Sequence, residues 1–254
     1  MESAADLERR FAGLERLFGV AGAQWVQQSH VAVVGIGGVG SWAAEALARS
    51  GVAQLTLIDM DHVAESNVNR QVHAVSATLG QSKILAMRDR IAQINPECQV
   101  TCVDDFVGTD NWPAILPGRV DAVIDACDQV PAKTAMAQWA RTQKVLFVSA
   151  GAAGGKRLGH CVEVCDLSAV THDPLLAKVR YTLRKVYAAP KEGKKMGVAC
   201  VFSREAVQLP QDACAAPTDG TLNCHGYGSL VTVTAAFGLC AAGWVMQQLS
   251  QRPR

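Results

Sequence analysis

The first 150 residues contain short apolar runs that alternate with longer segments of mixed polarity. These runs are rich in Val, Ile and Leu, and few polar residues interrupt them. Continuous runs of this kind are typical of strands that are buried on both faces of a parallel sheet. The pattern predicts strands at 31–35, 55–59, 101–105, 120–126 and 145–150.

The segments between these runs have the features of helices. An opening helix is expected at 4–18, where apolar residues share one face and Gly19 follows. One further helix ends at Gly51, and others are predicted at 80–94, 109–116 and 131–143. Strands that alternate with helices form doubly wound α/β sheets with right-handed crossovers. We therefore expect a mainly parallel, Rossmann-like sheet.

The alternation changes after Gly151, where several glycines lie close together. Beyond them the sequence predicts a strand near 158–166, a helix near 174–188 and a strand near 198–203. We interpret 151–254 as a C-terminal lobe laid over the first half of the same structural unit, and not as a domain that folds separately.

The segment 230–249 has no charged residue and is long enough to span a bilayer. Two Thr, two Gln, two Gly and four Ala nevertheless make it only weakly apolar. Apolar composition alone does not separate a membrane span from a helix buried in a core or a dimer interface. We favour the buried helix and keep membrane contact as the alternative.

The overall composition narrows the class of protein. Lys+Arg 24 against Asp+Glu 23 gives a net charge of +1, which excludes a globally basic nucleic-acid coat and an acidic disordered chain. The nine cysteines form no CxxC pair, which favours reduced thiols over a disulfide framework. The N-terminal segment carries acidic residues and lacks the apolar core of a signal peptide. We expect a cytoplasmic protein.

A glycine-rich turn joins the first strand to the next helix. The pattern G-x-G-x-x-G is formed by Gly35, Gly37, Gly38 and Gly40. Glycines at these positions allow a tight turn and a close approach of the backbone to phosphate, and the N-terminus of the helix favours an anion. Asp59 ends the second strand, where a carboxylate can accept from ribose hydroxyls. The first half of the chain is therefore predicted to bind a nucleotide.

Charged and amide side chains follow the second and fourth strands. After Asp59 come Asp61, Asn67, Asn69, Arg70, Gln71 and Lys83, and Asp128 follows the fourth strand. A dinucleotide site has no evident need for Arg70 and Lys83, whereas attack at the α-phosphorus of a triphosphate does, because charge builds on the phosphate oxygens. Asp128 is placed to hold Mg²⁺. We predict catalytic roles for Arg70, Lys83 and Asp128.

The ordered set GIGGVG, D-x-D, S-N-x-N-R-Q, Lys83 and D-A-C-D resembles the ThiF/MoeB-like adenylating enzymes, which are related to ubiquitin-activating enzyme. The resemblance implies that the glycine turn holds ATP, that Asp59 binds ribose, that Arg70 and Lys83 contact phosphates and that Asp128 binds Mg²⁺. It also implies that Asp61, Asn67, Asn69 and Gln71 contact the nucleotide, and that the enzyme is a homodimer.

Over almost the whole chain, segments such as RFAGLERLFG, NRQVHA and GVACVFSRE resemble the bacterial tRNA threonylcarbamoyladenosine dehydratases. This resemblance implies ATP-dependent ring closure of the threonylcarbamoyl group beside the tRNA anticodon, through adenylation of the threonyl carboxylate. It implies tRNA as the partner, with sulfur-transfer proteins as further candidates. The position that aligns with an Arg contributed across the family's dimer interface is Gly13, so Arg10 or Arg16 would have to replace it.

The segment 178–195 is the strongest independent indication of an RNA substrate. It supplies Lys178, Arg180, Arg184, Lys185, Lys191, Lys194 and Lys195 against Glu192 alone, with Tyr181 and Tyr187 as stacking groups. The alternative is a solvated basic helix face. Cys224 is either an acyl or persulfide relay or an inert residue.

Three other functions remain open from the residues. The first is adenylation of the C-terminus of a small sulfur-carrier protein, which predicts a zinc site. The second is a nicotinamide-dependent oxidoreductase, which would leave Arg70 and Lys83 without a role. The third is a binding module without activity.

Overall fold

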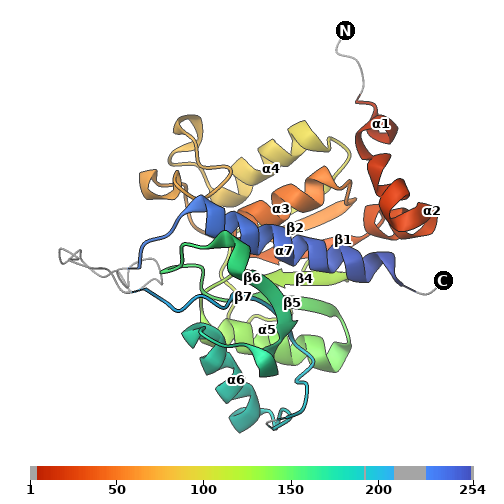
Figure 1. The fold of residues 1–254 in the computed structure, drawn as a ribbon. Coiled ribbons are helices and arrows are strands. Elements are labelled where there is room, and N and C mark those ends of the chain that lie inside the picture. The colour runs from red at the N-terminus through yellow and green to blue at the C-terminus, as the bar shows by residue number, and fades with distance from the viewer. Residues whose placement is uncertain (1–4, 192, 209–226, 253–254) are drawn as a thin grey trace.

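The computed structural model describes residues 5–191, 193–208 and 227–252 (Figure 1). Its centre is a 7-stranded sheet in the order β3-β2-β1-β4-β5-β7-β6. The strands are β1 His30–Val34, β2 Gln54–Ile58, β3 Gln99–Val103, β4 Ala122–Asp125, β5 Leu146–Ala150, β6 Val162–Asp166 and β7 Ala199–Ser203. Neighbouring strands are parallel except β6, which is antiparallel to β7. The predicted mainly parallel, doubly wound sheet is confirmed.

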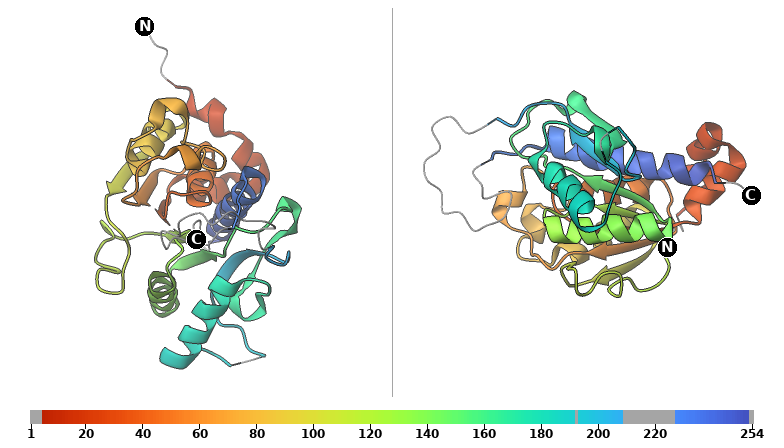
Figure 2. Two further views of the ribbon diagram at one scale, coloured as in Figure 1. Left: turned by 90° about the vertical axis from the view of Figure 1, so that its left-hand side faces the viewer. Right: turned by 90° about the horizontal axis from the view of Figure 1, so that it is seen from below.

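Helices cover both faces of the sheet (Figures 1 and 2). One face packs against α3 Gly40–Arg49, α4 Lys83–Ile94 and α7 Val231–Ser250. The other packs against α5 Val130–Gln143 and α6 Pro174–Val186. Alternate residues of each central strand enter the two cores: Val33 belongs to the first and Ala32 to the second. Burial on both faces explains why these strands read as continuous apolar runs.

The N-terminal segment forms two short helices, α1 Leu7–Phe11 and α2 Gly13–Gln27. Asp6 caps α1 by accepting from the Arg9 N–H at 2.9 Å. The single helix predicted at 4–18 is wrong, because α2 continues to Gln27 after a kink at Gly19, which has φ +71°. A left-handed residue interrupts a helix, and glycine adopts that conformation without the clash of a Cβ atom.

The helix predicted at 109–116 is also wrong. Residues 109–115 form turns, held by bonds such as Ile115 N to Asn111 O at 2.9 Å. Pro113 has no N–H to donate, and proline disfavours helical backbone at the residue before it. Trp112 is buried here and meets Trp139 of α5 edge to face, with ring centroids 5.2 Å apart.

The uncharged C-terminal segment forms α7, which crosses the sheet beside α3 (Figure 1). Phe237, Ala241 and Val245 are fully buried. A Cβ atom at Gly238 would lie 2.3 Å from the Val39 carbonyl oxygen, so glycine allows the two helices to approach closely. In the described part of the chain, no helix combines the length and the hydropathy required to cross a membrane. The prediction of a buried helix is confirmed.

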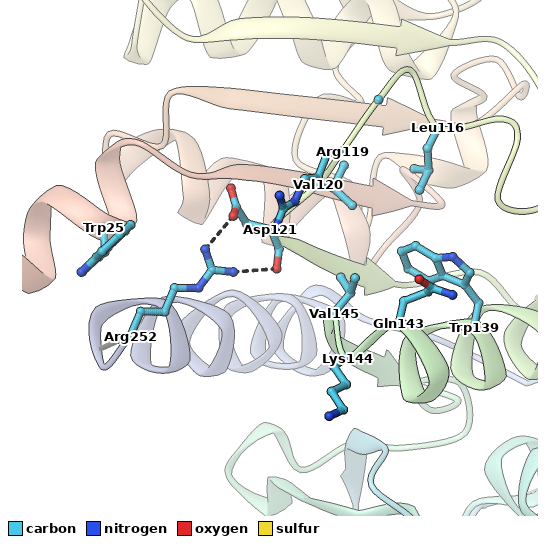
Figure 3. A pocket seen from close by; sticks show the side chains of 11 residues that line it. Trp25, Leu116, Arg119, Val120, Asp121, Trp139, Gln143, Lys144, Val145 and Arg252 are labelled. Atoms are coloured by element: carbon cyan, nitrogen blue, oxygen red, sulfur yellow. Dashed lines mark hydrogen bonds and ion pairs between the residues drawn. The ribbon is translucent and has the colours of Figure 1, made fainter. Parts of the chain in front are cut away.

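The far end of α7 is tied to the amino edge of the sheet, where the strands begin (Figure 3). Arg252 Nη1 donates to Asp121 Oδ1 at 2.6 Å, and the His30 N–H donates to Asp121 Oδ2 at 2.8 Å. A cavity of ≈ 620 Å³ opens here between Trp25 and Trp139. It lies at the edge opposite the predicted nucleotide site, because that site follows the carboxyl ends of the strands.

Candidate nucleotide-binding site

The glycine turn after β1 is packed tightly on its inner side. Gly35 has φ +86°, and a Cβ atom there would lie 2.9 Å from the backbone of Ala126. A Cβ atom at Gly40 would lie 1.7 Å from the Gly35 carbonyl oxygen. Gly37 is different, because its Cβ position meets nothing nearer than Gln71 Nε2 at 4.0 Å. The open side of the turn is therefore at Gly37, where the second glycine of this pattern lets phosphate approach the backbone.

This difference predicts opposite effects for two alanine substitutions. Gly40→Ala is expected to destabilise the protein by roughly 3 kcal/mol, because two backbone segments would have to separate. Gly37→Ala is expected to leave the unfolding free energy within about 1 kcal/mol of wild type but to weaken ATP binding at least roughly tenfold, because its methyl group occupies the phosphate side of the turn. Urea unfolding and calorimetric titration with ATP measure the two effects. Equal ATP affinity in Gly37→Ala would contradict the position given to phosphate.

Asp59 lies directly after β2 and binds back to the turn. The residue is 7% exposed. Its Oδ2 accepts from the Ile36 N–H at 2.6 Å, and its Oδ1 accepts from the Asp61 N–H at 2.8 Å. Burial raises the pKa of Asp59, although the charge of Lys83 and these two hydrogen bonds oppose the shift. Each carboxylate oxygen has a further lone pair, so the group can still accept from a hydroxyl.

Lys83 is the first residue of α4 and lies near Asp59, at the edge of the sheet where the parallel strands end. Its ammonium group donates to Asp61 Oδ2 at 2.7 Å, and its own N–H donates to the Asp61 carbonyl at 3.0 Å. The Lys83 side chain is 8% exposed, whereas Asp61 is 53% exposed. Asp61 thus holds a buried cation near Asp59. The nucleotide contacts predicted for both residues stay predictions.

Arg70 is buried and joins this site to the start of α7. Its Nη1 donates to Asn69 Oδ1 at 3.0 Å and to the Ser66 carbonyl. Its carbonyl accepts from Trp42 Nε1 at 3.0 Å and from Thr234 Oγ1 at 3.3 Å. Figures 1 and 2 show the segment between β2 and α4 beside the N-terminal end of α7. The last helix therefore fixes the backbone of the predicted phosphate-binding arginine.

The amide residues around Arg70 divide into two kinds. Asn67 closes a turn, since its Oδ1 accepts from the Ala64 N–H at 3.0 Å, and the exposed Asn69 donates to the Ser229 carbonyl at 2.8 Å. Gln71 is 4% exposed, and its Oε1 is buried without a hydrogen-bond partner among the described residues. A buried amide whose oxygen lacks a partner, beside Gly37, fits a group that contacts a ligand. Gln71 therefore has the strongest structural support among the predicted amide contacts.

Asp128 follows β4 and reaches the same edge of the sheet. It is half-buried, and its Oδ1 accepts from Gln129 Nε2 at 3.3 Å. The 126–128 segment lies against the glycine turn, because the Gly35 Cβ position contacts Ala126 and Cys127. One carboxylate here fits Mg²⁺, which keeps several waters and takes its other ligands from substrate phosphates.

The sequence did not reveal a fully buried network of hydrogen bonds and one ion pair close to Asp128 in the chain. Lys133 and Asp125 are both 0% exposed and pair at 3.0 Å. Lys133 also donates to the Ala150 carbonyl at 2.7 Å, and Ser149 Oγ donates to Asp125 Oδ2 at 2.6 Å. The sequence feature that could have revealed the network is the position of Lys133 on the same helix face as Ala137 and Ala140. A charged residue on an apolar face requires a buried partner.

Cys127 lies between the two aspartates and is a poor nucleophile. Its Sγ donates to Asp125 Oδ1 at 3.0 Å. Burial and the neighbouring Asp125 carboxylate raise the pKa of Cys127 well above its usual range, so the thiol stays protonated at neutral pH.

His73 is a second buried group that the sequence did not single out. It is 2% exposed, and neither ring nitrogen has a partner among the described residues. Burial, followed by the charges of Lys83 and Arg90, lowers the pKa of His73 to about 4. The folded protein therefore holds a neutral imidazole at a pH where an exposed histidine is protonated.

This shift predicts a loss of stability in acid. The unfolded chain takes up the His73 proton near pH 6.5, whereas the folded protein does so only near pH 4, so the free energy of unfolding falls as pH drops through this range. We expect His73→Leu to remove about 2 kcal/mol of the decrease between pH 7 and pH 5. Urea unfolding at the two pH values measures this difference. Identical pH dependence in wild type and variant would contradict it.

Arg10 lies away from these contacts. Arg10 donates to the carbonyl of Ile94, the last residue of α4, at 2.7 Å, whereas Lys83 begins that helix. At 1.5 Å per residue the two ends of α4 are roughly 16 Å apart, so Arg10 does not join its own chain's site. Arg16 is exposed, and its predicted role across a dimer stays a prediction. Cys224 lies outside the described residues.

Known proteins resemble this chain in both sequence and fold. The ThiF family model matches residues 9–254. The tRNA threonylcarbamoyladenosine dehydratase of Haemophilus influenzae is 41% identical over 247 residues, with 96% of this chain and 95% of that protein covered. The crystal structure of Escherichia coli tRNA N6-threonylcarbamoyladenosine dehydratase with ATP has a TM-score of 0.87 at 42% identity and covers 97% of this chain and 96% of that one. Its AMP complex has a TM-score of 0.86 at 43% identity and covers 98% and 97%. The chain belongs to the ThiF family.

Proposed function

We propose that this protein uses ATP to remove one water from threonylcarbamoyladenosine in tRNA. The observation that carries the proposal is the convergence of the glycine turn, the buried Asp59 carboxylate and the buried cations Arg70 and Lys83 at one edge of the sheet. This set matches a triphosphate better than a neutral ligand. The relatives that the chain matches over almost its full length are named for the dehydratase activity. Separate crystal structures of the Escherichia coli protein contain ATP and AMP.

The proposed reaction has two steps. An oxygen of the threonyl carboxylate attacks the α-phosphorus of ATP, and the bond to pyrophosphate breaks. A nitrogen of the same substituent then attacks the resulting acyl carbon, loses its proton and releases AMP, which keeps the attacking oxygen. The substrate has then lost one water. The second step is intramolecular, so it gains from proximity and needs no enzyme thiol.

The chain's own residues have distinct parts in the first step. Asp59 accepts from the ribose hydroxyls and orients the nucleotide. Arg70 and Lys83 stabilise the negative charge that grows on the α-phosphate and on pyrophosphate. Asp128 is placed to hold Mg²⁺, which when bound neutralises phosphate charge. The C-terminal lobe, 151–254, would position the tRNA substituent.

An isotope experiment tests the reaction. The protein is incubated with ATP, Mg²⁺ and threonylcarbamoyl-modified tRNA whose threonyl carboxylate carries ¹⁸O. We expect pyrophosphate release, ¹⁸O in AMP and a nucleoside lighter by one water in mass spectrometry. Label in orthophosphate would indicate attack at the γ-phosphorus and would overturn the proposal. Adenylation of a sulfur carrier's C-terminus with unchanged tRNA would instead support the alternative function, and an EDTA control tests the metal requirement.

We also propose that the protein acts as a homodimer. Leu17 and Val20 on α2 are 75% and 58% exposed, and Leu239 on the uncharged α7 is 49% exposed. Exposed apolar groups on two helices favour a surface that another copy covers. Light scattering at the concentration used for assays measures the mass, and a monomer that is fully active would contradict this proposal.

A further inference from the structure

The geometry points to a ridge on α6 and the segment after it as the surface that binds the tRNA backbone. We define the ridge by its exposed residues Lys178, Tyr181, Lys185, Tyr187, Lys191, Lys194 and Lys195. The inference rests on the proposed function, because it locates the tRNA contact of that activity.

The structure separates the basic residues of this segment into two groups. Arg180 Nη1 donates to the carbonyls of Leu167 at 3.1 Å and Val170 at 2.8 Å, so this arginine points toward the protein. Arg184 Nε donates to the Pro190 carbonyl at 3.2 Å. Both arginines, which the sequence counted among the RNA contacts, hold the ridge in place instead. They are therefore not part of the proposed surface.

The lysines form the outer group. Lys178, Tyr181 and Lys185 follow the spacing i, i+3, i+7 and share the exposed face of α6, opposite the buried Leu176, Val179 and Leu183. Lys191, Lys194 and Lys195 continue the positive charge beyond the helix. Among the described residues, no ion pair involves any of the five lysines. The positive charge of the ridge is thus available to phosphates.

The exposed aromatic groups distinguish the ridge from an ordinary solvated helix face. Tyr181 is 63% exposed and Tyr187 is 40% exposed. Lys185 Nζ lies 5.6 Å from the centroid of the Tyr181 ring. Unstacked RNA bases stack on exposed aromatic rings of this kind beside phosphate-binding cations. The arrangement therefore favours a single-stranded part of an RNA.

The segment that returns from the ridge is anchored firmly. The Ala189 N–H donates to the Leu183 carbonyl at 3.1 Å. Asp166 accepts from the N–H groups of Met196 at 2.9 Å and Gly197 at 2.8 Å. Burial opposes ionisation of Asp166, but these hydrogen bonds outweigh it and lower its pKa, so the anchor stays charged. These bonds tie the segment to the protein at Ala189 and again at Met196 and Gly197, which limits the ordering cost of binding.

The ridge also begins at the correct edge of the sheet. Asp173 caps α6 by accepting from the Leu176 N–H at 2.9 Å, and its other oxygen accepts from the Ala152 N–H at 2.8 Å. Ala152 follows β5, so α6 starts at the edge that carries the nucleotide site. From there α6 extends for roughly 20 Å at 1.5 Å per residue. An RNA with its modified nucleoside at the site can therefore lie along the ridge.

Binding of threonylcarbamoyl-modified tRNA at several salt concentrations tests the surface. The full-length variant Lys178→Gln/Lys185→Gln is expected to bind about tenfold more weakly at 0.1 M salt and to reduce the slope of log affinity against log salt by roughly 1.5. Tyr181→Ala is expected to bind the tRNA about tenfold more weakly without a change in the slope. Tyr181→Phe is expected to keep the wild-type affinity, because its ring can still stack. ATP affinity is expected to be unchanged in all of them.

The matched control is Arg119→Gln/Lys144→Gln, which removes the same charge outside the ridge, at the edge of the sheet away from the nucleotide site (Figure 3). Ridge variants that bind tRNA as tightly as this control would overturn the ridge while the proposed function stands. A wild-type protein that neither binds nor dehydrates the tRNA would overturn both. Ridge variants that keep tRNA affinity but lose binding to phosphatidylserine vesicles would assign the ridge to a membrane surface and reject the proposal.

Discussion

Arg70→Gln is expected to lower turnover of modified tRNA by roughly three orders of magnitude, because the positive charge that stabilises departing pyrophosphate is lost. Glutamine retains part of the side chain's length and a donor for the carbonyl of Ser66, which Arg70 contacts. Charge accumulates mainly in the transition state, so kcat is expected to fall more than ATP affinity. Pyrophosphate release under saturating ATP and tRNA measures the effect.

Arg88→Gln is the matched control for this substitution. Arg88 is on α4, pairs with Asp89 at the surface and is 47% exposed in its side chain. Surface pairs of this kind contribute little to stability, so we expect wild-type turnover. Thermal unfolding of both variants shows whether they are folded. A folded Arg70→Gln protein with wild-type turnover would mean that Arg70 does not face the reacting phosphate.

The central sheet was predictable because its strands are buried on both faces. Such strands appear as unbroken apolar runs, and β1, β2, β4 and β5 fall within one or two residues of their predicted ranges. The positions of Asp59 and Asp128 follow from the same fact, since the carboxyl ends of parallel strands meet at one edge. Both residues could therefore be placed at the same edge of the sheet, although they are far apart in the sequence.

Two segments were hard to interpret from the sequence, each for a different physical reason. The predicted helix at 109–116 has the right polarity, but Pro113 cannot donate the hydrogen bond that a helix interior requires. Composition could not decide whether 230–249 crosses a membrane or packs in the core. The deciding feature is the fit of Gly238 against α3, which depends on a residue almost 200 positions away.

Long side chains are the other source of uncertainty. Arg180 and Lys178 lie two residues apart and look equivalent in the sequence, yet one bonds to buried carbonyls and the other is exposed. An arginine can bury its stem and turn its head either way. For this reason a count of basic residues indicates a surface, whereas the structure is needed to say which cations belong to it.

Lys133→Met is expected to destabilise the protein by about 3–5 kcal/mol, because it leaves Asp125 buried with no cation. Burial disfavours the charged ammonium of Lys133, but the Asp125 carboxylate outweighs burial and raises the pKa of Lys133. Lys133 is thus a cation inside the core, and its contact with Asp125 at 3.0 Å is what keeps it there. Urea unfolding measures the loss, and Lys144→Met, at an exposed position, is the control.

The double variant Lys133→Met/Asp125→Asn separates stability from positioning. Removing both charges is expected to recover most of the lost free energy, because a neutral buried pair avoids the desolvation penalty. Activity is expected to be lower than in wild type, since the variant loses the bond from Lys133 to the Ala150 carbonyl at the end of β5. Asparagine at position 125 can still accept from the Cys127 N–H through Oδ1. If the double variant recovered full turnover, the pair would contribute to stability alone. If Lys133→Met were as stable as wild type, Asp125 would have to be paired by another group.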